Sequence, residues 1–236
     1  MVSQKRSLWL DRTGSVLALM LALGLLVGWL RVASAMTSFY LFGLGGIGAV
    51  LVSLVFLFRR LRGSPLGSAG LATCAAALAF LLAIGTSSGD GPPINDFTTD
   101  LANPPAFTHA RTLPANLGRD MAYPADFAPQ QQDCCSDLAS QNFTAPPVET
   151  LEAVTQIIEG EPQWVITNVN PENGTIEAVA TTFIFGFQDD LVIRITPTGS
   201  GSRVDMRSKS RDGKSDLGAN AARIRTFQSQ LSGKIR

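Results

Sequence analysis

Histidine and cysteine are scarce in this chain. Its 236 residues include one histidine, His109, and three cysteines, Cys74, Cys134 and Cys135. A structural zinc site uses four such ligands at suitable spacing, so we expect no metal centre and no cofactor. The adjacent pair Cys134 and Cys135 leaves three interpretations open: a vicinal disulfide, pairing with another chain, or two free thiols that serve as small residues.

Motifs of the common enzyme classes are also missing. The sequence has no serine nucleophile elbow, no phosphate-binding glycine loop and no zinc-protease motif. The catalytic option that remains is a hydrolase at the membrane surface that uses carboxylates such as Asp189, Asp190 or Asp205 as acid and base. We keep this as the alternative function. A deep pocket with two carboxylates and no opposing arginines would favour it.

Charge is distributed unevenly along the chain. The first 86 residues carry seven basic residues and one acidic residue, a net charge of +6, and the rest carry twelve basic and eighteen acidic residues, a net charge of −6. A basic patch interleaved with aromatic residues is lacking. This pattern argues against nucleic acid as a partner and indicates a basic membrane region followed by an acidic domain.

Three long apolar runs without internal charge lie at residues 14–30, 38–58 and 65–85. Each approaches or reaches the roughly 20 residues that a helix needs to cross a bilayer. Three such runs in succession, with charges confined to the breaks, are typical of membrane spans rather than of buried helices in a soluble protein. We predict a three-span region at residues 1–86 that contacts the lipid bilayer.

Basic residues predict the orientation of these spans. They concentrate before the first run and between the second and third, at Arg59, Arg60 and Arg62, whereas the first connection holds only Arg31. Because basic loops stay in the cytoplasm, we expect an integral protein of the bacterial inner membrane with a cytoplasmic N-terminus and a periplasmic C-terminal domain. Alternatively, the first run is a cleaved signal peptide, since VASA at residues 32–35 offers an Ala-x-Ala site. The C-terminal domain then lies on the same side.

Residues 87–146 are rich in proline, glycine and asparagine and show no clear period. A disordered linker carries few apolar residues. This segment repeats them, at Phe97, Leu101, Phe107, Met121, Tyr123 and Phe127. The sequence therefore predicts an extended, irregular strap across a folded domain.

Regular structure is expected at residues 147–236. Apolar residues at helical spacing predict helices at residues 150–160 and 215–231. Alternating residues and turn signals predict strands at residues 163–169, 175–185, 190–196 and 203–210. The fold class is α+β: three N-terminal transmembrane helices, then an exterior domain with a roughly four-stranded antiparallel sheet, two flanking helices and the long strap.

The two sides of the predicted sheet differ in chemistry, because successive side chains of a strand face opposite ways. One side carries the apolar residues Ile176, Ala178, Ala180, Leu191, Ile193, Ile195, Val204 and Met206. The other side, which we call the polar face, carries Glu177, Arg194, Asp205 and Arg207. It is either a solvated surface with cross-strand ion pairs or a groove for a ligand under the strap.

Polar residues also gather where the last helix begins. Ser215 or Asp216 suits its N-cap, and the free N–H groups of a helix start favour an anion. Equally, aspartates there can hold the arginines in a structural network. The candidate ligand-binding residues are Arg194, Asp205, Arg207, Arg211, Asn220 and Arg223.

Two long motifs carry a family resemblance. The stretch GTIEAVATTFIFGFQDDLVIRI, then VDMRSKSRDGKSDLGANAARIRTF, resembles the bacterial and plastid family catalogued as domain of unknown function 1499, and INDFTTDLANPPAF is similar to its opening motif. The resemblance spans residues 93–231. It implies frequent membrane attachment and supplies no reaction. The segment CCSD at Cys134 departs from the family pattern, which more often reads tyrosine-proline-aspartate there.

Three functional interpretations follow. The first is a binding or structural module for an envelope ligand, either an anionic or lipid-derived molecule or a membrane protein. The second is the hydrolase named above. The third is an assembly role in which the glycines Gly43, Gly45, Gly46 and Gly48 let a partner helix approach, unless the chain's own spans use them.

Overall fold

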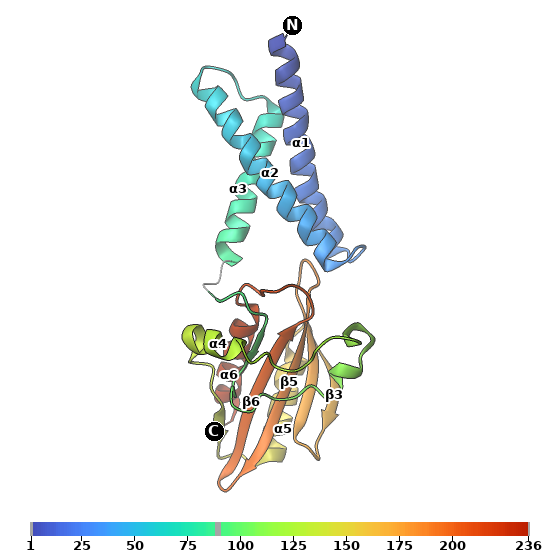
Figure 1. The fold of residues 1–236 in the computed structure, drawn as a ribbon, viewed down its shortest axis with the longest axis vertical. Helices are drawn as coiled ribbons and strands as arrows, with labels where there is room; N and C mark the ends of the chain where they lie inside the picture. The colour runs from blue at the N-terminus through green and yellow to red at the C-terminus, as the bar shows by residue number, and fades with distance from the viewer. Residues whose placement is uncertain (1, 88–90, 236) are drawn as a thin grey trace. The chain divides into compact units, whose positions relative to one another are not determined.

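The computed structural model describes residues 2–87 and 91–235, and Figure 1 shows its ribbon. The chain divides into two compact units. The first, the helical unit, comprises Met1–Ser88 and Phe183–Gly186, and the second, the sheet unit, comprises Gly89–Thr182 and Phe187–Arg236. Residues 88–90, which begin the predicted strap, lie outside the described residues.

Three helices form the helical unit. They are α1 (Val2–Trp29), α2 (Ala35–Leu61) and α3 (Ser68–Ser87). Each contains a segment long and apolar enough to cross a membrane, so the prediction of three such helices is confirmed. The break before α2 ends at Ser34, whose side chain accepts a hydrogen bond from the Thr37 backbone N–H at 3.1 Å and caps the helix start.

Glycines of α2 lie against the neighbouring helices of the same unit. A Cβ atom at Gly45 would lie 2.5 Å from the backbone nitrogen of Leu21 in α1, and one at Gly46 would collide with the ring of Phe80 in α3. These glycines therefore allow close packing among the chain's own helices. Gly43 differs, because a Cβ atom there would have no described neighbour within 4 Å.

A six-stranded antiparallel sheet forms the centre of the sheet unit, in the order β1-β6-β5-β4-β3 with β2 also paired to β6. Its strands are β1 (Asp96–Thr98), β2 (Gln141–Phe143), β3 (Trp164–Asn170), β4 (Thr175–Thr181), β5 (Gln188–Thr198) and β6 (Gly201–Ser210). The mixed α+β fold is confirmed. The sheet is larger than the four strands expected, because the strap adds β1 and β2.

The strap is more regular than the sequence indicated. It contains the short 3₁₀ helices η1 (Ala110–Thr112) and η2 (Pro114–Asn116) and the helix α4 (Phe127–Cys135). Its strands extend the edge of β6: β1 pairs Asp96 with Lys209, and β2 pairs Gln141 with Val204. Pairing with β6 orders these three-residue strands, which have no periodicity of their own.

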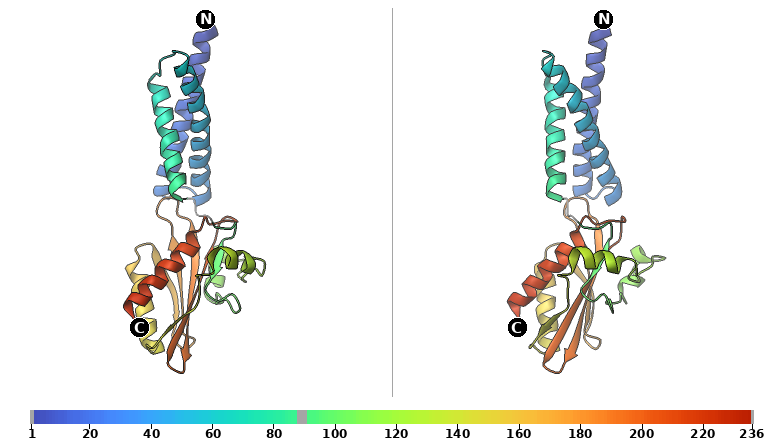
Figure 2. Two further views of the ribbon diagram at one scale, coloured as in Figure 1. Left: turned by 90° about the vertical axis from the view of Figure 1, so that its left-hand side faces the viewer. Right: turned by 60° about the vertical axis from the view of Figure 1, so that its left-hand side comes forward.

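Two helices cover one face of the sheet and part of the strap crosses the other, as the views in Figure 2 show, while strap residues such as Phe97 and Cys135 join the core beneath the helices. The helices α5 (Pro147–Gly160) and α6 (Ala219–Lys234) pack on the apolar face. All eight residues predicted to face the core lie in this hydrophobic cluster. On the polar face the strap contributes a small apolar cluster, in which Phe107 and Ala110 contact Val192.

Two predicted elements are shorter in the structure. β4 ends at Thr181 rather than at residue 185, and α6 begins at Ala219 rather than at residue 215. The delay of α6 has a backbone cause, because Leu217 (φ 54°) and Gly218 (φ 83°) adopt left-handed conformations that a helix cannot contain. Leu217, within the helix predicted at residues 215–231, therefore lies outside α6 and is 56% exposed.

Candidate functional site

Buried charge fills the polar face of the sheet. Three of the four residues predicted there, Glu177, Asp205 and Arg207, are at most 2% exposed. Burying a charge is unfavourable unless a partner of opposite charge or several hydrogen bonds compensate for the lost water. The partners of each group therefore decide what this face can do.

Asp96 of β1 holds two cations of β6. Arg207 donates from Nε to Oδ1 at 2.9 Å and from Nη2 to Oδ2 at 2.7 Å, and Lys209 Nζ lies 2.9 Å from Oδ2. The guanidinium of Arg207 also donates to the Pro105 and Met121 carbonyl oxygens and lies over the Phe107 ring, 4.8 Å from its centroid. Arg207 thus joins β6 to the strap.

A second cluster surrounds Asp205. Arg194 Nη2 lies 2.9 Å from Asp205 Oδ2 and 3.0 Å from Asp100 Oδ2, and Arg203 Nη2 contacts the same two aspartates at 3.2 and 2.7 Å. The Ser140 hydroxyl donates to Asp205. Two arginines and two aspartates therefore balance in charge, which indicates a structural cross-strand network.

A third cluster surrounds Asp190, which is fully buried. Arg211 forms a fork with its carboxylate, with Nη2 2.7 Å from Oδ1, and Asn116 Nδ2 donates to Oδ2 at 2.9 Å. Arg119 lies farther away, with Nη1 3.7 Å from Oδ2, and donates to the Ser210 carbonyl oxygen. These contacts tie η2 of the strap to β5 and β6.

Glu177 of β4 has no cation partner within 4 Å among the described residues. Its Oε1 accepts from the backbone N–H groups of Thr108 and His109, both at 2.8 Å, and from the Thr108 hydroxyl at 2.6 Å. Its Oε2 accepts from the Ala110 N–H at 2.7 Å. Backbone donors at the start of η1 thus take the place of a counter-ion.

The other face of the sheet carries a polar cluster beneath α6. Asp189 pairs with Arg223 Nη2 at 2.5 Å, and Arg223 Nη1 donates to Asn220 Oδ1 at 2.6 Å. Asn220 is fully buried and also bonds Ser208 and Ser210. Adjacent Asp189 and Asp190 point to opposite faces, as alternation in a strand requires.

Asp216 anchors the start of α6, although Gly218 occupies the N-cap position. Its carboxylate accepts from the backbone N–H groups of Asn220 at 2.7 Å and of Gly218 at 2.9 Å. Burial raises the pKa of Asp216, while these backbone hydrogen bonds act in the opposite direction. Asp216 thus accepts hydrogen bonds at the helix start, as predicted for a capping residue, although it lies two positions before the N-cap residue Gly218.

The six predicted site residues do not converge on one site. Arg194 and Asp205 lie in one cluster, Arg207 in a second and Arg211 in a third. Asn220 and Arg223 lie on the opposite face of the sheet. Among the six, Arg207 alone lines a pocket that the strap forms.

That pocket, which we call the strap pocket, has a volume of about 820 Å³. Its walls come from the strap, and Arg207 of β6 contributes to them. The charged lining residues are Arg111, Arg119, Asp120 and Arg207, and the apolar ones include Leu101, Phe107 and Met121. Arg111 and Arg119 were not among the predicted residues, because they lie in a segment without sequence periodicity.

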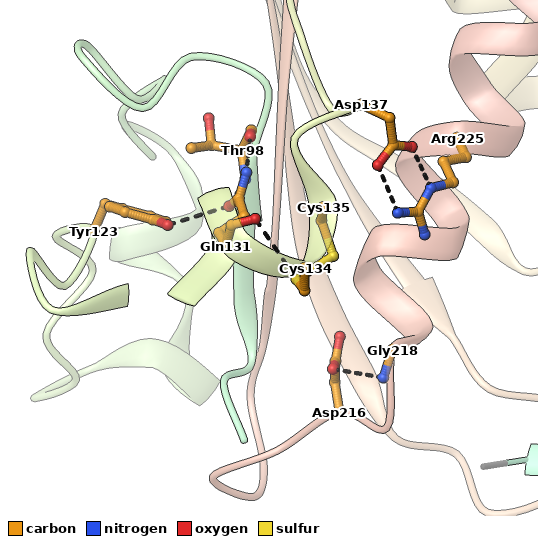
Figure 3. Close-up of a disulfide and its surroundings, with 9 residues drawn as sticks. All are labelled: Thr98, Tyr123, Gln131, Cys134, Cys135, Asp137, Asp216, Gly218 and Arg225. Atoms are coloured by element: carbon orange, nitrogen blue, oxygen red, sulfur yellow. Dashed lines mark hydrogen bonds and ion pairs between the residues drawn. A yellow bond between two sulfur atoms is a disulfide. The ribbon is translucent and has the colours of Figure 1, made fainter. Parts of the chain in front are cut away.

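Tyr123 also lines the strap pocket, and its hydroxyl is held by a hydrogen bond to Gln131. Burial raises the pKa of its hydroxyl, and the nearby Asp96 carboxylate adds to the rise. The neutral hydroxyl donates to Gln131 Oε1 at 3.1 Å. Gln131 in turn bonds both backbone groups of Thr98 in β1, accepting from its N–H at 3.0 Å and donating to its carbonyl at 2.6 Å (Figure 3).

The carboxylates proposed for a hydrolase lie against arginines. Asp189 pairs with Arg223, Asp190 with Arg211, and Asp205 with Arg194 and Arg203. None of these three aspartates lines the strap pocket, whose one carboxylate is Asp120. Within residues 2–87 and 91–235, no group of three or more histidine, cysteine, aspartate or glutamate side chains is placed to hold a metal ion.

Comparison with known families identifies the sheet unit. The family model described as "Protein of unknown function (DUF1499)" matches residues 96–231. The chain belongs to the DUF1499 family. The match begins in β1 and ends in α6, so the DUF1499 domain includes the strap as well as the long strands.

Solved structures add little to this assignment. Protein MLL2253 from Mesorhizobium loti is 13% identical, with a TM-score of 0.34, over 40% of this chain and 92% of that one. Protein CV1439 from Chromobacterium violaceum is 9% identical, with a TM-score of 0.23, over 40% of this chain and 90% of that one. Both scores are too low to carry an argument. No curated protein matches the chain.

The buried clusters predict that Arg211→Ala and Asp216→Ala each destabilise the DUF1499 domain. Without Arg211, the buried Asp190 loses its closest cation, and without Asp216 two backbone donors at the start of α6 lose their acceptor. We expect each loss to lower the free energy of unfolding by about 1–3 kcal/mol. Urea unfolding of the domain measures it. Unchanged unfolding in both variants would instead favour a surface role for these residues.

Proposed function

We propose that this protein is a membrane-anchored binding module whose DUF1499 domain holds an anionic amphiphile, a molecule with an acidic head and an apolar portion, in the strap pocket. The observation that carries the proposal is the composition of the lining, which combines three arginines and one aspartate with apolar side chains. Pockets that bind small molecules are mostly apolar, with a few polar groups that fix orientation.

Arg111 is the cation best placed to meet the acidic head. It is exposed and lines the pocket, and no acidic side chain of the described residues lies within 4 Å of its guanidinium. Arg119 and Arg207 already donate to protein oxygens. A phosphate or carboxylate near Arg111 would gain a charge-assisted hydrogen bond, and the two other arginines would add favourable potential.

The apolar lining supports an amphiphile over a free inorganic anion. Leu101, Phe107 and Met121 lie in the same pocket as the arginines, and contact with an alkyl group would remove their surfaces from water. Membrane lipids and their breakdown products combine these two chemistries. The three apolar helices of the chain keep the domain near such molecules.

The proposed location follows from the basic residues of the helical unit. Arg59, Arg60 and Arg62 lie between α2 and α3 or at the end of α2, and by the positive-inside rule this connection is cytoplasmic. The N-terminus is then cytoplasmic, and the DUF1499 domain lies outside the cytoplasm, in the periplasm of a bacterial inner-membrane protein. A cleaved first helix would leave the domain on the same side.

Ligand binding is tested with the fragment of residues 91–236 by native mass spectrometry and calorimetry. The probes are dihexanoyl phosphatidic acid, the zwitterionic dihexanoyl phosphatidylcholine and inorganic phosphate. We expect phosphatidic acid to bind most tightly. Arg111→Ala is expected to weaken its binding about tenfold, close to 1.4 kcal/mol, because one charged hydrogen bond is lost.

Lys214→Ala is the matched control, since Lys214 is exposed and does not line the strap pocket. It is expected to leave the affinity unchanged. Equal binding of the phosphatidylcholine probe would contradict recognition of the anionic head. Tight binding of inorganic phosphate alone would contradict the role of the apolar lining. An equal loss in both variants would indicate non-specific charge attraction.

A further inference from the structure

A disulfide joins two neighbouring residues at the end of α4. Cys134 and Cys135 are bonded to each other, and Figure 3 shows the pair beside Gln131. Cys134 is exposed, whereas Cys135 is 6% exposed and belongs to the main hydrophobic cluster. Cys134 therefore lies at the surface, and Cys135 lies in the core.

This disulfide is a poor structural cross-link. A disulfide stabilises a fold mainly by closing a loop in the unfolded chain, and the effect grows with the length of that loop. Here the sequence separation is one residue, so the bond joins no two elements of the fold and restricts the unfolded chain little. The reactivity of this disulfide therefore explains its presence better than a contribution to stability does.

We infer that Cys134 and Cys135 form a reversible dithiol–disulfide exchange site that reacts with dithiol reductants. A thiolate of the reductant attacks the exposed Cys134 sulfur, and the bond to Cys135 breaks. Cys135 leaves as a thiolate and takes a proton from water, while Cys134 is held in a mixed disulfide. The second thiol of the reductant then releases Cys134 and forms a cyclic disulfide. Two electrons and two protons pass to the protein.

The surroundings of each sulfur suit the reduced state as well. A buried cysteine thiol behaves as a small apolar residue, so Cys135 can remain in the hydrophobic cluster after reduction. Cys134 Sγ lies 3.6 Å from the Gln131 carbonyl oxygen. A thiol at Cys134 therefore has an acceptor in place for its weak S–H donor.

Anchors on both sides keep the two sulfurs close in either state. Before the pair, Gln131 bonds both backbone groups of Thr98. After it, Asp137 forms a double ion pair with Arg225 of α6, at 2.5 and 2.8 Å (Figure 3). Arg225 lowers the pKa of Asp137 by hydrogen bonding to its carboxylate. A segment held at both ends can re-form the bond without refolding.

The test uses the full chain in detergent micelles with Cys74→Ala, because Cys74 is a free cysteine. Folded protein is treated with dithiothreitol, labelled with N-ethylmaleimide and mapped by mass spectrometry. Without reductant we expect no label. With reductant we expect two labels, at Cys134 first and then at Cys135, and treatment with the thiol oxidant diamide, after the dithiothreitol is removed and before labelling, should abolish both.

Serine variants distinguish a thiol–disulfide exchange site from a disulfide that stabilises the fold. Cys135→Ser is expected to label at Cys134 without reductant, and the double variant Cys134→Ser, Cys135→Ser is expected to unfold within about 3 °C of the parent. Two labels on untreated protein would overturn the inference, as would reduction that occurs only in unfolding concentrations of denaturant. A much larger fall in the unfolding temperature of the double variant would show a structural staple.

Discussion

Asp96→Ala is expected to lower the free energy of unfolding of the DUF1499 domain by about 3–5 kcal/mol. The substitution leaves Arg207 and Lys209, both less than 10% exposed, without their shared carboxylate. Breaking a buried ion pair by removing one partner is costly because the remaining charge stays desolvated. Here two cations remain, only 2.7 and 2.9 Å from the lost oxygen, and they also repel each other.

Urea unfolding followed by circular dichroism measures this loss, with Asp133→Ala on the exposed surface of α4 as the control. The control should change stability by less than about 0.5 kcal/mol. If Asp96→Ala does not fold, the triple variant Asp96→Ala, Arg207→Met, Lys209→Met should recover folding, since no buried charge then lacks a partner. An Asp96→Ala domain as stable as the parent would contradict the structural role of this cluster.

Glu177→Gln is expected to destabilise the domain by about 2–3 kcal/mol, although the two side chains have nearly the same shape. Both carboxylate oxygens accept hydrogen bonds, Oε1 from Thr108 and His109 and Oε2 from Ala110. A glutamine amide has one acceptor oxygen and one NH₂ donor. In either orientation the amide NH₂ group faces a backbone N–H donor. The remaining hydrogen bonds also lose the strength that the carboxylate charge gives them.

Chemical unfolding of the variant measures this effect, and amide hydrogen exchange at residues 108–110 locates it. Glu159→Gln, which makes the same chemical change at an exposed position of α5, is the control. We expect exchange at the three amides to accelerate in Glu177→Gln and to stay unchanged in Glu159→Gln. Unaltered protection of Ala110 in Glu177→Gln would show that the carboxylate does not hold this segment.

Sequence periodicity predicted those helices and strands in which apolar residues recur at regular spacing. In β5, Leu191 and Ile193 alternate with Val192 and Arg194, and the structure places the first two in the main core. The three apolar helices follow from length and lack of charge in the same way. Such patterns are visible because burial on one side imposes them along the whole element.

The short strands and helices of the strap were not predicted from the sequence, because they depend on partners distant in the chain. Asp96 reads as one more acid in a proline-rich segment, and its strand consists of three residues. Pairing with β6 sets Asp96 opposite Lys209 and beside Arg207. Gln131 likewise reads as one of three glutamines before the cysteines, yet its side chain serves as a hydrogen-bonding partner of β1.

The candidate binding residues predicted from the sequence lie in several separate clusters of the structure. The arginines singled out lie in β5, β6 and α6 or directly after β6, and the structure pairs them with aspartates. Arg111, which has no acidic side chain of the described residues within 4 Å, lies in η1, where no pattern marks it. Helices and strands can be anticipated from period, but a pocket between irregular segments requires the three-dimensional path of the chain.

Closure of the β6 edge bears on the solubility of the domain. β1 and β2 together occupy the outer side of β6, a strand of ten residues. A fragment that began at residue 147 would retain the four long strands and both flanking helices, but it would leave the β6 edge open. An open edge of that length recruits strands from other molecules and promotes aggregation. By pairing with β6, the strap therefore also opposes strand pairing between molecules.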